Sequence, residues 1–315
     1  MSPLKISTHI TAPDAPGLID GIVAADKAGL DTAWLTVGGP APDPFAVFTA
    51  AAHHAERINF GTSIVPTFPR HPLSMAQGAM TVDQLAPNRL KLGVGPSHKP
   101  AIEGTWGIPF HKPLSHLREY VTVLNAVLHT GEVDFDGELI QAHARIAAPT
   151  QVQVMISALR EKAFQLSGEL TAGGISWMSP LPYIRDVAAP AQQAGADAAG
   201  RAKPAMIVHT PVVVCDDKAL VFAAAKRQFG FYQTLPYYSQ MLQDAGYAEA
   251  ADTEFTQRMA DGLILSGSEK EVGDRIRALP EFGVDEMLAA IVQLPEDAQV
   301  ANDRTLALLG DLANA

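Results

Sequence analysis

The segment Arg89–His98 reads RLKLGVGPSH and predicts the element around which the rest of the chain is arranged. Leu90, Leu92 and Val94 alternate with other residues, which is typical of a strand with one apolar face. The two glycines between them leave the backbone bare, so that a flat molecule can lie against it. The run then ends in a proline, a serine and a histidine. We therefore predict a buried strand that turns sharply and presents polar groups at its tip.

These glycines do not form a dinucleotide-binding fingerprint. The third glycine of a G-x-G-x-x-G motif would fall at His98, and Pro100 and Gly104 are expected to break any helix that followed at once. On these ten residues alone, a core strand with a tight turn is an equally good interpretation.

The composition is that of a globular protein with a large core. Of the 315 residues, 47% are hydrophobic and 18% are charged, which suits two ordinary domains or one large α/β barrel. A formal net charge of -11 argues against general binding to nucleic acid. The single cysteine, Cys215, excludes an internal disulfide. The N-terminus has no signal peptide pattern, and no apolar stretch approaches the ~20 residues that cross a bilayer. We expect a cytoplasmic protein that binds neither nucleic acid nor membranes.

Strand and helix patterns alternate along the chain. Strands are predicted at Leu4–Ile10, Thr32–Val37, Ile58–Val65, Leu90–Val94, Val152–Ile156, Gly174–Met178, Met206–Val214 and Val284–Val292. The segments between them carry helix signals, such as Asp43 before Pro44 and the capping box of Ser268 and Glu271. Such alternation implies parallel strands, and eight of them predict a single (β/α)8 barrel domain over residues 1–315. An open doubly wound sheet is the alternative.

Three segments interrupt this alternation. An irregular insertion is expected at 99–112, directly after the fourth strand, and a small hairpin within 131–149. Residues 232–262 are rich in aromatic residues and predict extra helices before the eighth strand.

In such a barrel, the chemistry lies on the loops after the carboxyl ends of the strands. These positions are His9, Gly38, Gly39, 63–68, 95–99, 157–160, Met178 and Ser179. No metal site is expected, because the adjacent His53 and His54 point apart on a helix. Neither a G-x-S-x-G elbow nor a P-loop occurs. The small residues suit a binding surface for a planar cofactor, and we expect Trp177 and Trp106 to lie near it. For Trp177, packing in the core is the alternative.

Several motifs resemble the bacterial luciferase-like superfamily, and most closely its branch that uses the deazaflavin coenzyme F420. GTSIVPTFPRHP stands at 61–72 and NRLKLGVGPSH at 88–98. Similar stretches are GIPF at 107–110, HLREY at 116–120, LSGEL at 166–170 and GISWM at 174–178. The resemblance implies a homodimeric (β/α)8 barrel with an insertion after strand four. It also places the cofactor ring against a bulge in strand three, where the Ser63–Ile64 peptide bond would be cis.

Two departures from the family pattern concern the substrate and the phosphate-binding site. Sugar-phosphate dehydrogenase relatives carry aspartate and histidine where this chain has Val37 and Gly38, and a glutamate where it has His98. That reaction is therefore not expected here. Relatives also carry glycine after strand five, where Leu159 and Arg160 stand; backbone N–H groups and the Arg160 charge could still hold a phosphate.

The leading hypothesis is an oxidoreductase that transfers a hydride between F420 and an unidentified small organic substrate. His98 is the candidate catalytic acid, since an unperturbed imidazole pKa of ~6.5 suits proton transfer near neutral pH; the alternative is that it only shapes the turn or contacts the cofactor. The expected cofactor-binding residues are Ser63, Ile64, Gly95, Pro96, Ser97, Ser157, Leu159, Arg160 and Trp177. An FMN-dependent monooxygenase of the same superfamily and a non-catalytic flavin-binding barrel are the other hypotheses.

Overall fold

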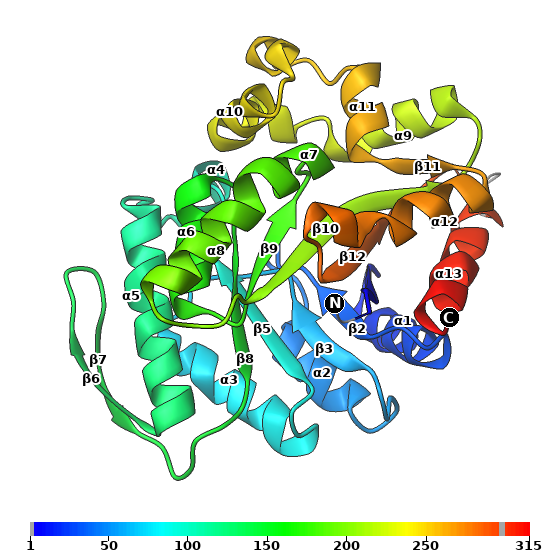
Figure 1. Ribbon diagram of the computed structural model, residues 1–315. Helices are drawn as coiled ribbons and strands as arrows, with labels where there is room; N and C mark the ends of the chain where they lie inside the picture. Colours follow the sequence, from blue (N-terminus) through cyan, green and yellow to red (C-terminus); the bar gives the residue numbers. More distant parts are fainter. Residues whose placement is uncertain (1–2, 296–299) are drawn as a thin grey trace.

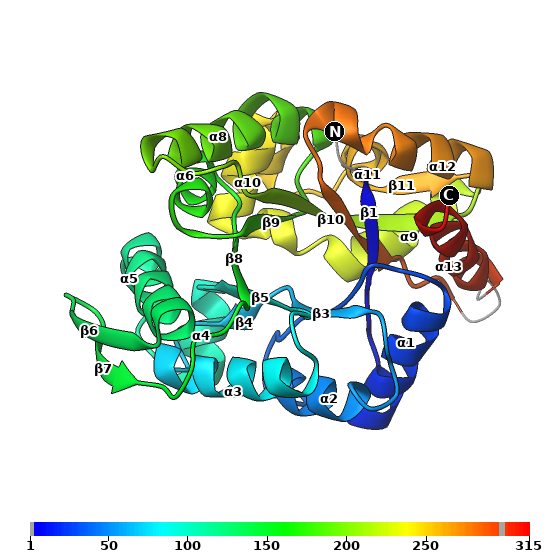
Figure 2. The same ribbon diagram turned by 60° about the horizontal axis from the view of Figure 1, so that its bottom comes forward.

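The computed structural model describes residues 3–295 and 300–315 and shows a closed parallel barrel (Figures 1 and 2). Its strands are β1 (Lys5–His9), β2 (Thr32–Leu35), β3 (Asn59–Thr62), β5 (Leu90–Gly95), β8 (Gln153–Ser157), β9 (Gly173–Trp177), β10 (Ala205–Val214) and β12 (Glu286–Ile291). They are hydrogen-bonded in chain order, and β1 pairs with both β2 and β12, which closes the ring. All eight predicted strands and the barrel are thus confirmed, and the open sheet is excluded.

Helices cover the outside of the barrel. They are α1 (Ala15–Lys27), α2 (Pro44–Ala51), α3 (Pro72–Leu85), α5 (Pro113–Asn125), α6 (Glu161–Leu170), α8 (Ala189–Ala198), α9 (Lys218–Phe229), α12 (Glu269–Arg277) and α13 (Val300–Ala313). A π-helical turn extends α5 over Ala126–Thr130, and α7 (Leu181–Tyr183) with a second π-turn precedes α8. The Asp43 side chain caps α2, and Ser268 with Glu271 forms the predicted capping box of α12.

The predicted hairpin and extra helices are present. Strands β6 (Glu132–Asp136) and β7 (Gln141–Arg145) form an antiparallel hairpin that projects beside α5 (Figure 1). The segment before β12 holds α10 (Pro236–Asp244), α11 (Gln257–Leu263) and two 3-10 turns, Tyr232–Thr234 and Ala248–Asp252. Figure 1 shows α9, α10 and α11 together at the end of the molecule away from the hairpin.

One sequence expectation is corrected, and two further features of the strands are seen only in the structure. The insertion after β5 begins at once with a helix, α4 (Lys99–Trp106), because Pro100 lies in the first turn, where no backbone donor is needed, and one interior glycine costs only about 1 kcal/mol. The third strand is interrupted: β3 is followed by the short β4 (Val65–Pro66), with Ser63 and Ile64 between them. A short strand, β11 (Leu265–Gly267), pairs with the far end of β10 and gave no sequence signal.

A buried ionic network closes the amino-terminal end of the barrel. The Lys91 ammonium donates to Asp31 and Glu286, at 2.7 Å in each case. The Glu286 carboxylate also accepts from the Ser7 hydroxyl at 2.6 Å and from Trp34 Nε1 at 3.0 Å. Burial alone would raise the pKa of Asp31, but Lys91 holds it below its usual value. The ion pairs of this network therefore fill the amino-terminal end of the barrel, and the carboxyl end remains as the candidate location of the active site.

No described helix is long and apolar enough to cross a membrane.

Candidate active site at the carboxyl end of the barrel

The barrel interior is filled by inward-facing side chains from neighbouring strands. One apolar group contains Trp34, Met155, Ile175, Ile207 and Leu288. Because side chains alternate across a strand, the next inward-facing residue lies two positions closer to the carboxyl end. On β8, β9 and β10 these residues are Ser157, Trp177 and His209. The register agrees, since Trp177 lies opposite His209.

Six rings gather above this apolar layer. We call them the mouth cluster: His9, His98, Trp177, His209, Tyr232 and Tyr238. The Trp177 ring centroid lies 4.2 Å from that of His209 and 5.6 Å from that of Tyr232. His209 lies 5.4 Å from His9, and His98 packs edge-on at 5.7 Å from Tyr238. The contacts form one connected group from β1 to α10, so the extra helices complete the barrel mouth.

Burial holds every titratable ring of the mouth cluster in its neutral form. It lowers the pKa of His9 to about 4, and it lowers the pKa values of His98 and His209, the latter with a further contribution from His9. Burial also raises the phenol pKa values of Tyr232 and Tyr238. Among the described residues, no carboxylate, ammonium or guanidinium contributes to these five shifts. The rings of the mouth cluster are thus uncharged at neutral pH.

Two ring nitrogens of the mouth cluster lack a hydrogen-bond partner in the part of the chain that the structure describes. They are Nε2 of His209, whose residue is 6% exposed, and Nε1 of Trp177. The Tyr232 hydroxyl lies close enough to Trp177 to oppose the rise of the phenol pKa, but not in regular hydrogen-bond geometry. A buried polar atom without a partner is rare in proteins, and it marks a place where water or a ligand is expected.

Gly95, Ser157 and Ile64 converge beside these rings. A Cβ atom added at Gly95 would lie 2.1 Å from Ser157 Oγ and 3.2 Å from Ile64 Cγ1, so only glycine allows this approach. The Ser63–Ile64 peptide bond is cis, as the family resemblance implies. The Thr36 hydroxyl donates to the Ser63 carbonyl at 2.9 Å. The structure therefore brings together four of the predicted cofactor-binding residues; their role in binding stays a prediction.

The loop Pro96–His98 leads from β5 into α4. Ser97 adopts a left-handed conformation with φ of 60°, which turns the chain at the barrel rim. His98 occupies the N-cap position of α4 without making a side-chain cap, and its ring packs against Tyr232 and Tyr238. The expectation of an unperturbed pKa is wrong, because burial lowers it. A neutral imidazole suits a base or a neutral hydrogen-bond donor better than a stored acid.

Leu159 and Arg160 lead into the N-terminus of α6. Arg160 is the N-cap residue, makes no side-chain cap, and forms an ion pair with Asp244 of α10 at 3.4 Å. The guanidinium is about half exposed, with 46% of the side chain accessible. The first turn of α6 and the Arg160 charge are thus placed together at the rim, as a phosphate grip requires. In residues 3–295 and 300–315, no three His, Cys, Asp or Glu side chains gather as metal ligands.

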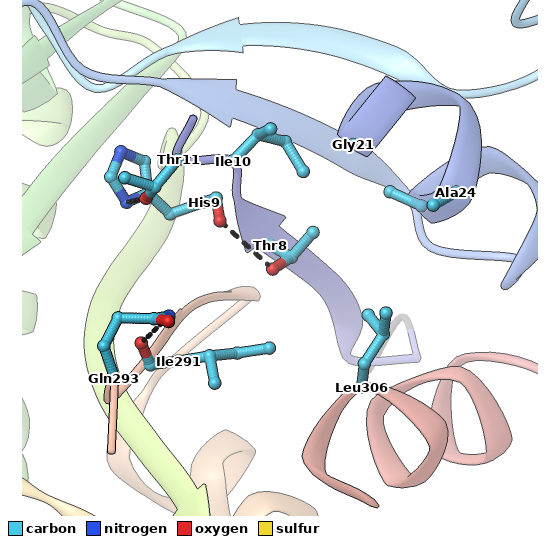
Figure 3. A pocket seen from close by; sticks show the side chains of 10 residues that line it. Thr8, His9, Ile10, Thr11, Gly21, Ala24, Ile291, Gln293 and Leu306 are labelled. Atoms are coloured by element: carbon cyan, nitrogen blue, oxygen red, sulfur yellow. Dashed lines mark hydrogen bonds between the residues drawn. The ribbon is translucent and has the colours of Figure 1, made fainter. Parts of the chain in front are cut away.

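A cavity of about 190 Å³ lies next to His9 but outside the barrel interior (Figure 3). Thr8, Ile10 and Ile291 line it, and they alternate with the inward-facing residues of β1 and β12, so the cavity lies between the barrel wall and helices α1 and α13. It is smaller than the ~300–1,000 Å³ of typical ligand pockets. We therefore place the candidate site at the mouth cluster and not in this cavity.

The sequence pointed to part of the mouth cluster only. His209 was missed because β10 extends to Val214, so the end of the strand is not where it crosses the barrel rim. Tyr238 lies in the segment 232–262 that predicts extra helices, and its contact with His98 gave no sequence signal. No sequence signal identifies His209, because β10 is buried on both faces and its sequence does not show which face points into the barrel. Trp106 lies at the end of α4, is 40% exposed, and is not part of the cluster.

A sequence profile described as "Luciferase-like monooxygenase" matches residues 2–286. The chain belongs to this family. An uncharacterised protein of Mycobacterium tuberculosis is 29% identical over 249 residues, which cover 73% of this chain and 72% of the relative. The 5,10-methylenetetrahydromethanopterin reductase of Archaeoglobus fulgidus is 25% identical over 288 residues, covering 84% of this chain and 86% of the relative.

Solved structures of the family share the whole fold. An F420-dependent secondary alcohol dehydrogenase in complex with an F420–acetone adduct has a TM-score of 0.80 at 16% identity, covering 99% of this chain and 98% of its own. A Baeyer–Villiger monooxygenase component from Pseudomonas putida in complex with FMN has a TM-score of 0.77 at 18% identity, covering 98% of each chain. The predicted membership in the superfamily is confirmed, and both cofactor types occur among its structural neighbours.

Proposed function

We propose that this protein is an F420-dependent oxidoreductase that transfers a hydride between the deazaflavin and a small organic substrate. The observation that carries the proposal is the convergence of Gly95, Ser157 and Ile64 beside an uncharged ring cluster at the carboxyl end of the barrel. A bare backbone, one hydroxyl and one aliphatic side chain fit a planar ring with a polar edge. The similarity to a methylenetetrahydromethanopterin reductase over 84% of this chain supports redox chemistry.

When bound, a deazaflavin supplies the hydride chemistry, and the chain's own residues supply position and a proton site. Gly95 and Ile64 would pack against the ring, and the hydroxyls of Ser157 and Ser97 would bind its polar edge. The N-terminus of α6 and Arg160 would hold the phosphate of its tail. His98 holds or moves a proton at one ring nitrogen, in the neutral state that its burial favours. Tyr232 and Tyr238 exclude water from the mouth.

The direct test is titration of the purified protein with F420 and, separately, with FMN, followed by fluorescence. We expect saturable F420 binding that is at least ~10-fold tighter than FMN binding. Ile64→Asp places a charge in the ring bed and should weaken F420 binding by at least ~10-fold. Leu85→Asp, on an exposed position of α3, is the matched control and should bind normally.

The variants must first unfold cooperatively, which shows that the barrel is intact. Preferential binding of FMN would favour the monooxygenase hypothesis instead. F420 affinity that is unchanged in a folded Ile64→Asp variant would place the ring elsewhere. Binding of F420 without turnover of any reductant and acceptor pair would favour a non-catalytic carrier.

A further inference from the structure

The rings that face the barrel mouth offer a substrate no opposite charge. His9, His98 and His209 are neutral at pH 7, and the phenols of Tyr232 and Tyr238 remain protonated. At the rim, Arg160 forms an ion pair with Asp244, where each charge offsets the other. The charges in the barrel interior belong to the Lys91 network at the opposite end, where they satisfy one another.

This arrangement selects against ionised substrates. Moving a carboxylate, phosphate or ammonium from water into a buried site without a partner costs several kcal/mol, because burial removes its hydration and nothing replaces it. An uncharged molecule escapes this cost and gains from contact with the indole and phenol faces. The mouth cluster thus favours uncharged substrates before any specific contact is made.

Of the two ring nitrogens of the mouth cluster that have no partner among the described residues, one belongs to a residue that is almost fully buried, His209. Nε2 of His209 has no hydrogen bond in the described chain, and its residue is 6% exposed. The His209 ring packs between the rings of Trp177 and His9, with centroid distances of 4.2 Å and 5.4 Å, and these contacts fix its orientation. In a neutral imidazole this nitrogen either accepts from a hydroxyl or donates to a carbonyl, according to the tautomer.

We propose that the mouth cluster admits an uncharged molecule bearing a hydroxyl or carbonyl oxygen, and that Nε2 of His209 binds this oxygen. The inference rests on the proposed function, because it takes the mouth cluster as the substrate side of that site. It goes further by naming the chemical class of substrate and a binding residue that the motifs do not contain. It also disfavours phosphorylated substrates.

The first experiment compares probes of equal shape and different charge. Cyclohexanol, cyclohexanone, cyclohexanecarboxylate and protonated cyclohexylamine are titrated at pH 7.5 by ligand-observed NMR. We expect both neutral probes to bind at least ~10-fold more tightly than either charged probe, since only the charged ones lose hydration without compensation. Equal or tighter binding of the carboxylate or the ammonium would overturn the charge argument.

The second experiment isolates the nitrogen. His209→Phe keeps an aromatic ring but removes both ring nitrogens, Nε2 included, so cyclohexanol binding should weaken by ~3–10-fold, the usual value of one neutral hydrogen bond. Methylcyclohexane has no oxygen and should bind as before, whereas a purely structural role would weaken both. His209→Gln should recover part of the difference. His143→Phe, an exposed histidine on the β6–β7 hairpin, is the matched control.

A variant-free readout covers the case in which His209→Phe does not fold. In protein with 15N-labelled histidine, cyclohexanol should shift the Nε2 resonance of His209 more than methylcyclohexane does. Equal shifts would overturn the assignment. Each titration is run without cofactor, with F420 and with FMN. Failure of F420 to bind refutes the proposed function only, while loss of the neutral preference or of the His209 effect in all three states refutes this inference.

Discussion

Gly95→Ala tests the close packing on which the candidate ring bed depends. The added Cβ would lie 2.1 Å from Ser157 Oγ, 3.1 Å from Ser157 Cβ and 3.2 Å from Ile64 Cγ1. Ordinary van der Waals contact begins near 3.4 Å, so the serine must change rotamer and both neighbours must move by a few tenths of an ångström.

The expected magnitude follows from two opposing effects. Overpacking a close-packed core costs about 1–3 kcal/mol. Replacing glycine by alanine in a strand stabilises the fold by about 0.5–1 kcal/mol, because alanine loses less conformational entropy than glycine when the chain folds. We therefore expect a net loss of about 0–2.5 kcal/mol, with a midpoint of about 1 kcal/mol, in the free energy of unfolding, measured by urea titration. F420 affinity should fall as well, because the new methyl group displaces Ser157 and occupies the backbone surface offered to the ring.

The double variant Gly95→Ala/Ser157→Ala identifies the cause. Removing Oγ leaves 3.1 Å as the shortest contact, so much of the stability should return, with a coupling of about 0.5–2 kcal/mol between the two sites. Gly104→Ala in α4 is the matched control, since nothing lies within 4 Å of its added Cβ, and it should be neutral or slightly stabilising. A Gly95→Ala protein with wild-type stability and wild-type F420 affinity would refute the reasoning.

Three further predictions concern charge and protons. His98→Ala should lower turnover by ~10²–10⁴-fold with a much smaller effect on cofactor affinity, as steady-state kinetics would show, and a loss of affinity alone would make it a binding residue. Lys91→Met should lower the free energy of unfolding by about 3–5 kcal/mol, because it leaves the Glu286 carboxylate buried without its ionic partner. Lys99 is exposed, so Lys99→Met should change the free energy of unfolding by less than about 1 kcal/mol in the same urea titrations. The free energy of unfolding should also fall as the pH is lowered from 6.5 toward about 4, because in this window the unfolded chain binds a proton that buried His9 does not, and His9→Gln should flatten this dependence.

Local sequence patterns predicted the barrel well because each signal acts within one element. The alternation in Leu90–Val94 depends on one strand face, and the Asp43 and Ser268 caps depend on a single helix turn. The failure at Lys99–Trp106 is local too: Pro100 was weighed as a helix breaker without regard to its position in the first turn. The grouping of Gly95 with Ser157 and Ile64 was predictable from the family motifs and the positions of the strand ends, while the contact distances were not.

The rim of a closed barrel, by contrast, is set by register between strands, and periodicity within one strand carries no such information. Strand β10 is an example of this limit. Its sequence from Met206 to Val214 is apolar except for His209 and Thr210, so it does not show where the barrel ends. Only the pairing of His209 with Trp177, the last residue of β9, shows that the barrel mouth crosses β10 at its middle. Read from the sequence alone, a histidine inside an apolar strand looks like a satisfied core residue; in the barrel its Nε2 is buried without a partner. The role of His209 at the barrel mouth can therefore be inferred only from the residues that surround it in the fold.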